Sequence, residues 1–105
     1  MNDRDGSTQT ETFVWRYEVK PDATDAFVIA YGRGGDWDTF FSGALGYLGT
    51  EFYRDAATLN VYLTVDYWSK RGQRDAYVAS RQSEYDALDA RCAQFTVNER
   101  RIRGD

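Results

Sequence analysis

Residues 59–68 alternate between two sides of an extended chain, and this pattern constrains the fold more than any other segment does. One side carries aliphatic residues and one tyrosine, whereas the other mixes polar residues with two aromatic ones. Successive side chains of a β-strand point to opposite faces of the sheet, so the segment predicts a strand with large side chains on both faces. The first set is Leu59, Val61, Leu63, Val65 and Tyr67, and the second is Asn60, Tyr62, Thr64, Asp66 and Trp68.

The same periodicities predict the other elements. Alternation predicts strands over residues 12–20, 46–54 and 94–103. Helical spacing predicts a helix over residues 23–31, a break at the glycines of 32–35, a short helical piece over 36–41, and a second long helix capped by Ser69. The order strand, helix, strand, strand, helix, strand is that of the ferredoxin-like βαββαβ arrangement. This is an α+β fold with an antiparallel four-stranded sheet and both helices on one face.

Two helices cover only one face of such a sheet, yet both faces are predicted to carry large apolar groups. On the 46–54 strand, alternation sets Tyr47 and Tyr53 opposite Leu48 and Phe52. A contiguous apolar patch on the uncovered face would favour aggregation, and a second copy of the chain stacked sheet on sheet removes it. The sequence therefore predicts a homodimer.

Length, charge and apolar runs exclude several classes of protein. The 105 residues fit one domain over residues 12–105, after a polar tail without periodicity at residues 1–11. The net charge of −4 argues against nucleic acid as a partner, and the longest apolar run, residues 26–31, is too short for a membrane span. With one cysteine, Cys92, and no secretory-signal layout at the N-terminus, we expect a cytoplasmic protein.

The chain contains no histidine. Ser-His and Cys-His nucleophile pairs are therefore impossible, and only carboxylates and one thiol remain as candidate ligands for a transition metal. The glycines of residues 32–35 lack the Lys-Ser/Thr ending of a phosphate loop and lie between two helical pieces. We therefore expect no metal, haem, flavin or nucleotide cofactor.

Several segments together resemble a known family. They are Val19-Lys20-Pro21, Phe27, Gly46-Tyr47-Leu48-Gly49-Thr50-Glu51 and the third predicted strand, which ends in Trp68-Ser69 before a helix. This layout is similar to that of the antibiotic biosynthesis monooxygenase family, over nearly all of residues 12–103. The resemblance implies a dimeric α/β barrel with a pocket between sheet and helices in each subunit. The pocket often binds polycyclic aromatic or quinone-like compounds, and some members are oxygenases that use no metal, flavin or haem.

The polyketide-oxidising branch of that family has an asparagine four residues before a strand tryptophan, then a tyrosine and an arginine on the following helix. If Trp68 matches that tryptophan, Thr64 takes the place of the asparagine and Arg74 that of the tyrosine, with Tyr77 one turn later. Arg81 is then the nearest arginine.

The haem-degrading branch holds its iron with a helix histidine, which this chain lacks. By rough register, Trp15 takes the place of that branch's first-strand asparagine, and Tyr77 that of its helix tryptophan.

Arg81 interrupts a helical stripe that otherwise holds Tyr77, Tyr85, Leu88 and Cys92. Either its stem packs while its charged head reaches solvent, or its guanidinium hydrogen-bonds an enolate or phenolate oxygen of a bound aromatic compound.

Trp68 has two interpretations of the same kind. It either plugs the end of its strand or lines the pocket.

We therefore expect a cofactor-independent monooxygenase that acts on a small aromatic or quinone-like compound. Such a protein needs only to orient the substrate, stabilise its anion and exclude water. The alternative is a non-catalytic member of the same dimeric fold that binds a small molecule or stabilises an assembly. The expected catalytic residues are Arg81, Trp68 and Tyr77, and the expected substrate-binding residues are Trp15, Thr64 and Tyr85.

Overall fold

A computed structural model of the chain describes residues 10–104, and the side chains of residues 10–102. Residues 1–9 of the predicted tail lie outside the described residues. Four antiparallel strands form one sheet in the order β2-β3-β1-β4. The strands are β1 (Glu11–Val19), β2 (Tyr47–Arg54), β3 (Val61–Trp68) and β4 (Thr96–Gly104). The helices are α1 (Thr24–Tyr31), α2 (Asp36–Ser42), α3 (Gln73–Ser80) and α4 (Gln82–Cys92), with 3-10 turns η2 (Pro21–Ala23) and η3 (Ala93–Phe95).

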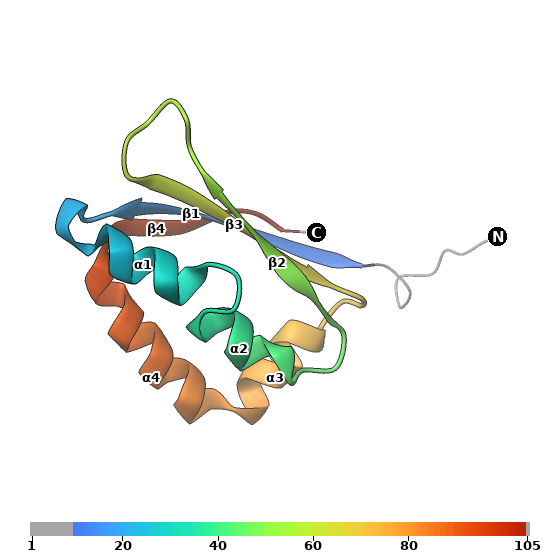
Figure 1. Ribbon diagram of the computed structural model, residues 1–105. Helices are drawn as coiled ribbons and strands as arrows, with labels where there is room; N and C mark the ends of the chain where they lie inside the picture. The colour runs from blue at the N-terminus through green and yellow to red at the C-terminus, as the bar shows by residue number, and fades with distance from the viewer. Residues whose placement is uncertain (1–9, 105) are drawn as a thin grey trace.

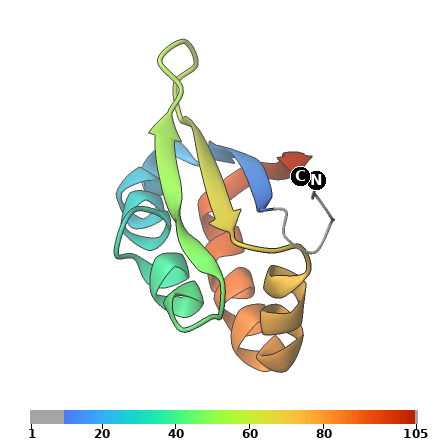
Figure 2. The same cartoon turned by 90° about the vertical axis from the view of Figure 1, so that its right-hand side faces the viewer.

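The four helices lie on one face of the sheet, and the other face carries no helix of the described chain (Figure 1). The β2–β3 connection projects beyond the sheet (Figure 2). It holds Leu59, which is 88% exposed, and Asn60, whose φ of 63° is left-handed. The predicted strand over residues 59–68 therefore begins two residues late, at Val61, because Asn60 turns the chain before it joins the sheet. The predicted α+β, ferredoxin-like architecture is confirmed.

The predicted orientation of the β2 side chains is wrong at the start of the strand, because a β-bulge lies there. The register against β3 shifts between Tyr47 and Gly49. Tyr47 consequently packs on Trp68, with ring centres 5.3 Å apart, and Phe52 stacks on Tyr62 at 5.5 Å. Both contacts lie on the helix side of the sheet. The bulge adds one residue to β2, so the side chain before the bulge points to the face opposite to the one that simple alternation predicts. Tyr47 and Phe52 therefore share a face, whereas simple alternation had set them on opposite faces.

The second long helix also differs from the prediction, since Gly72 and not Ser69 takes the N-cap position, the helix starts at Gln73, and it breaks at Arg81. Arg81 has φ −130° and ψ 39°, which are not helical values. Its N–H donates to the carbonyls of both Tyr77 and Val78, and this closes α3. Its own carbonyl accepts the N–H of Tyr85, which opens α4. Arg81 therefore stands at a corner, and the continuous stripe predicted through it does not exist.

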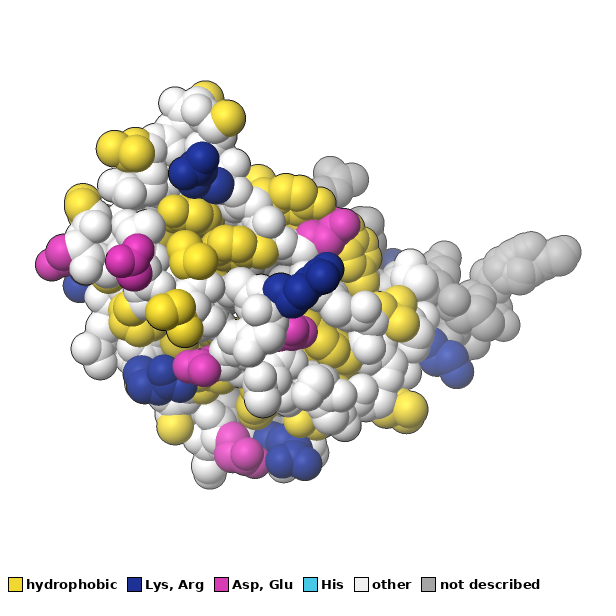
Figure 3. All heavy atoms as spheres, viewed as in Figure 1, with side chains coloured by type: hydrophobic (Ala, Val, Ile, Leu, Met, Phe, Trp, Pro, Cys, Tyr) yellow, Lys and Arg dark blue, Asp and Glu magenta, His cyan; other side chains and the backbone are white. Residues whose placement is uncertain are grey.

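The core consists of two clusters under the sheet. One is built around Phe27, which is fully buried and lies against Tyr17 and Tyr31. The other is built around Trp68, which packs edge-on against Phe41 at 5.5 Å. Trp15, Trp37 and Phe40 pack against both clusters and so join them. Figure 3, which faces the β2 edge, shows hydrophobic side chains in several patches separated by acidic and basic ones. Within residues 10–104, no helix is both long and apolar enough to span a membrane.

Candidate functional site

A cavity lies between the sheet and the helices, beside the residues that join the two core clusters. Aromatic rings from β1, α1, α2 and α4 form much of its wall. The cavity has a volume of about 50 Å³. The lining residues are Trp15, Tyr31, Trp37, Asp38, Phe41, Thr50, Thr64, Asp66, Arg74, Tyr85, Asp89 and Glu99.

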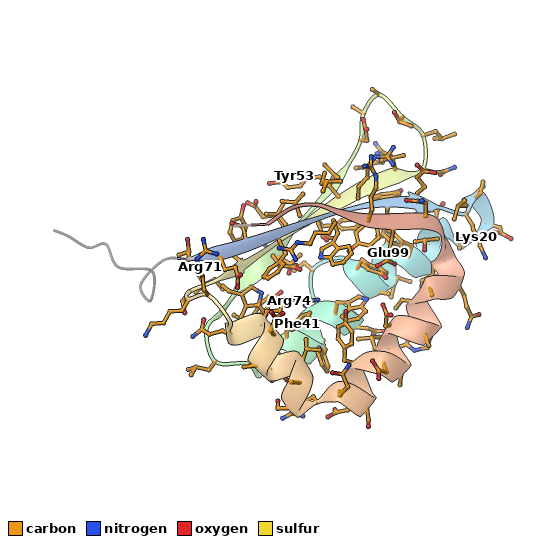
Figure 4. All side chains as sticks on the ribbon, turned by 180° about the vertical axis from the view of Figure 1, so that it is seen from behind. Lys20, Phe41, Tyr53, Arg71, Arg74 and Glu99 are labelled. Atoms are coloured by element: carbon orange, nitrogen blue, oxygen red, sulfur yellow. The ribbon has the colours of Figure 1, made fainter. Side chains whose placement is uncertain are left out.

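Arg74 is the one basic residue among those that line the cavity in the described part of the chain. It extends from the first turn of α3, and its side chain is 14% exposed. The guanidinium carbon lies 5.1 Å from the ring centre of Phe13, 5.7 Å from that of Phe41 and 5.8 Å from that of Tyr85. Figure 4 shows Arg74 beside Phe41, between α3 and the sheet. Three aromatic rings therefore hold this cation in place.

The hydrogen-bond donors of Arg74 are incompletely used. Its Nε is buried and has no hydrogen-bond partner. One terminal nitrogen donates to the Tyr85 hydroxyl at 3.4 Å, which is a long hydrogen bond, and the other lies 3.7 Å from Asp75. A buried donor without a hydrogen-bond partner lowers the stability of the fold. A ligand that supplies an acceptor to this donor would therefore be bound favourably.

Asp66 lines the same cavity from the sheet side, on β3. The Thr50 hydroxyl donates to its Oδ1 at 2.7 Å. Burial raises the pKa of Asp66 above its ordinary value; the Thr50 hydrogen bond and the charge of Arg74 oppose this rise, and the charge of Asp38 adds to it. A carboxyl with a raised pKa beside a cavity is a candidate proton acceptor.

The cavity is acidic, because Asp38, Asp89 and Glu99 also line it. Burial raises the pKa of Glu99, and the nearby charge of Asp89 raises it further. Burial likewise raises the pKa of the Tyr31 hydroxyl. Desolvation therefore favours neutral forms of several groups around this cavity.

Three of the six predicted site residues, Trp15, Thr64 and Tyr85, line the cavity. These are the residues expected to bind the substrate. Trp15 and Tyr85 supply half-buried rings, whereas Thr64 is only 3% exposed. The Thr64 hydroxyl is 3.0 Å from the Tyr17 hydroxyl, with which it forms a hydrogen bond.

The structure places the other three, Trp68, Tyr77 and Arg81, outside the cavity lining. Trp68 is fully buried in the core, which agrees with its interpretation as a plug. The Tyr77 hydroxyl donates to the carbonyl of Phe40 at 2.7 Å and ties α3 to α2. The Arg81 side chain is 47% exposed and pairs with Glu84 at 3.2 Å, so its head reaches solvent.

Arg74 and Asp66 are the site residues that sequence reasoning missed. The family resemblance located Arg74 at a tyrosine position but gave it no role, and Asp66 was placed only as a strand residue. One signal was present, since Asp66 is the one carboxylate on a strand face that also carries Tyr62 and Trp68, which is unusual for a packed surface. Within residues 10–102, no three cysteine or acidic side chains are grouped closely enough to hold a metal ion.

The sequence matches no protein-family model, and a search of curated proteins found no significant match. Solved structures do match. SnoaB of Streptomyces nogalater, a cofactor-independent oxygenase, is 18% identical with a TM-score of 0.75, over 91% of this chain and 90% of that one. A protein of Bordetella bronchiseptica provisionally assigned as an antibiotic biosynthesis monooxygenase is 12% identical with a TM-score of 0.74, over 91% and 94% of the two chains.

A Nitrosomonas europaea protein with the same provisional assignment is 13% identical, with a TM-score of 0.70 over 94% of this chain and 90% of that one. These likenesses extend over nearly the whole described chain, and at such identities they establish the fold. The chain has the fold of the antibiotic biosynthesis monooxygenases, as the resemblance in its sequence implied.

Proposed function

We propose that the chain is a monooxygenase that works without a cofactor and oxidises a small aromatic or quinone-like compound in this cavity. The observation that carries the proposal is the placement of Asp66 on the sheet side and Arg74 on the helix side of one aromatic-walled hollow. The fold shared with SnoaB, a cofactor-independent oxygenase, supports it.

The first step is removal of a proton from an activated aromatic substrate. Asp66, when ionised, accepts this proton, and its raised pKa makes it a better base than an exposed aspartate. The enolate or phenolate oxygen formed then accepts hydrogen bonds from the Arg74 guanidinium, whose Nε has no other partner. The aromatic rings around Arg74 keep water from competing for it.

The second step is electron transfer to dioxygen. For an anthrone-like substrate, the carbanion gives one electron to dioxygen, and the two radicals combine to form a C–O bond. The resulting peroxide takes up a proton and loses water as the second hydrogen leaves the same carbon. A CH₂ group and O₂ thereby become a carbonyl group and H₂O, with every atom and electron accounted for. The protein supplies Asp66 as the base, Arg74 as the cation, and aromatic side chains that exclude water.

The acidity and the size of the cavity define how a substrate enters. Four acidic residues and one basic residue line the cavity, which therefore disfavours entry of an anion, so the substrate enters neutral and ionises only beside Arg74. The space of about 50 Å³ is smaller than the cavity of roughly 150 Å³ that admits benzene in an engineered protein. Entry of a ring therefore requires lining side chains to rotate, and Trp15, Trp37 and Tyr85 are lining rings that are only half-buried.

We also propose that the chain works as a homodimer. The sheet face without helices carries Leu63, Val65 and Tyr67 from β3, and these side chains are only partly covered or exposed in a single chain. Tyr53 and Ile102, 47% and 43% exposed, continue this surface on the neighbouring strands. A second copy stacked on it buries this apolar area.

Oxygen uptake with anthrone, measured on protein stripped of metal and flavin, tests the activity. The parent should consume one O₂ per anthrone oxidised. Asp66→Asn keeps the acceptor for Thr50 but is not a base, so it should lower the rate about 10²–10⁴-fold. Asp86→Asn is the matched control, because Asp86 lies on α4 outside the cavity lining and bonds Gln82 instead.

Two results would contradict the proposal. One is equal rates for the parent and Asp66→Asn. The other is binding of anthrone without oxygen uptake by the parent, which would favour the alternative of a ligand-binding protein.

A further inference from the structure

Three short contacts between oxygen atoms link Asp66 on β3 to Asp38 on α2, and both carboxyls line the cavity. Asp66 Oδ1 lies 2.7 Å from Thr50 Oγ1, which lies 2.6 Å from the Tyr47 hydroxyl oxygen. That oxygen lies 2.9 Å from Asp38 Oδ1. The chain thus runs from a carboxyl on β3, through two hydroxyls on β2, to a carboxyl on α2.

Counting protons shows that this chain needs one more than its hydroxyls supply. Each of the three contacts requires one proton between its two oxygens, and Thr50 and Tyr47 bring one each. If both carboxyls are ionised, both hydroxyls donate outward to them. The Tyr47 and Thr50 oxygens, 2.6 Å apart, would then face each other with lone pairs only. A single proton on either carboxyl removes this repulsion, because all hydrogen bonds can then run in one direction.

The surroundings of the two carboxyls differ. Asp38 Oδ2 accepts the backbone N–H of Gly34 at 2.8 Å, so both oxygens of this carboxyl have a hydrogen-bond partner. Asp66 is half-buried, burial raises its pKa, and the charge of Asp38 raises it further. The resting proton therefore lies at the Asp66 end.

Other charged or titratable groups lie near Asp66. Arg74 of α3 lowers its pKa, and Tyr17 of β1 interacts with it electrostatically. Glu99 of β4 and Asp89 of α4 face the same cavity. These groups set how strongly Asp66 holds its proton, but none of them is among the oxygen atoms of the chain.

We propose that Asp66 and Asp38 share one proton through Thr50 and Tyr47, and that this chain carries protons from Asp66 to Asp38. In one shift, Asp66 gives its proton to Thr50, Thr50 gives its own to Tyr47, and Tyr47 gives its own to Asp38. Asp66 is then ionised and accepts a proton from the substrate, while Asp38 releases one to water. The catalytic use of the relay rests on the proposed function, whereas the shared proton does not.

The shared proton is tested on the ligand-free protein by NMR titration of ¹³C-labelled aspartate side chains. Asp38→Asn and Asp66→Asn assign the two resonances. In the parent, both carboxyl carbons should show a step at one common pH, where the shared proton is lost. In Thr50→Val and in Tyr47→Phe the link is broken, and each carbon should titrate with a step of its own.

Thr64→Val is the matched control, because Thr64 lines the same cavity but bonds Tyr17 instead of this chain. It should leave the common step in place. Independent steps in the parent would overturn the shared proton. A common step that survives in both Thr50→Val and Tyr47→Phe would also overturn it, since charge alone would then couple the two groups.

The catalytic use of the relay has a separate readout. Thr50→Val should lower kcat for oxygen uptake roughly tenfold or more, as loss of a proton-transfer route does, with little change in KM. An unchanged kcat would overturn this use while leaving the NMR result intact. Absence of oxygen uptake by the parent would count against the proposed function and not against the shared proton.

Discussion

At the scale of single residues, the unusual feature of this molecule is charge held inside an aromatic wall. Arg74 is surrounded by three rings, and Asp66 is a carboxyl whose pKa burial raises. Such groups cost stability unless a partner compensates them, so they tend to be found where chemistry uses them. The exposed Arg81–Glu84 pair, by contrast, contributes little to stability.

The raised pKa of Asp66 predicts a specific dependence of stability on pH. The folded state holds a proton on Asp66 more tightly than the unfolded state, whose pKa is close to 3.8. The contribution of Asp66 is therefore full below the unfolded pKa and is lost as pH rises through the folded pKa. Urea unfolding of the parent and of Asp66→Asn across this acidic range should show the parent losing free energy of unfolding relative to the variant. A difference that stays constant, or that grows in favour of the parent, would contradict the assignment.

At the scale of elements, the two glycines that flank α2 have different roles. A Cβ on Gly35 would lie 2.2 Å from the carbonyl oxygen of Ile29 and 2.7 Å from that of Ala30, both of which are backbone atoms of α1. Gly35 therefore permits α2 to start directly against the end of α1. A Cβ on Gly43 would meet only the Tyr77 hydroxyl, at an ordinary 3.5 Å.

We predict that Gly35→Ala lowers the free energy of unfolding by roughly 1–3 kcal/mol, because the backbone of α1 or α2 must move. Gly43→Ala at the other end of α2 is the control and should change it by no more than about 0.5 kcal/mol. Chemical denaturation of both variants measures this. Equal effects at the two positions would show that the close approach at Gly35 does not constrain the connection.

The elements themselves could be predicted from periodicity, but their irregularities could not. Alternation located all four strands, since a strand with a buried face repeats every two residues. The bulge after Tyr47 and the break at Arg81 depend on how β2 meets β3 and how α3 meets α4. No local pattern encodes those contacts. The same limit applies to the site, because Arg74 and Asp66 resemble surface charges until α3 packs against the sheet.

At the scale of the whole molecule, the uncovered sheet face predicts self-association. Light scattering at micromolar concentration should give twice the chain mass of 12.1 kDa. Leu63→Lys places a charge on this face and should yield monomers, because the charge would be buried against the partner. Leu45→Lys is the control, since Leu45 is 85% exposed and precedes β2 outside the sheet. A monomeric parent would contradict the prediction.

Arg74 is proposed to stabilise the anion of an aromatic compound in the cavity. Titration calorimetry with an ionisable hydroxyanthrone-like ligand and its O-methylated, neutral analogue tests it most directly. Arg74→Met keeps the packing volume and should weaken binding of the ionisable ligand by roughly 1.5–3 kcal/mol, the range for a hydrogen bond to a charged group, and that of the analogue much less. Arg81→Met should bind both ligands as the parent does. If Arg74→Met also binds both ligands as tightly as the parent, or if only Arg81→Met loses affinity for the ionisable one, Arg74 does not stabilise the bound anion.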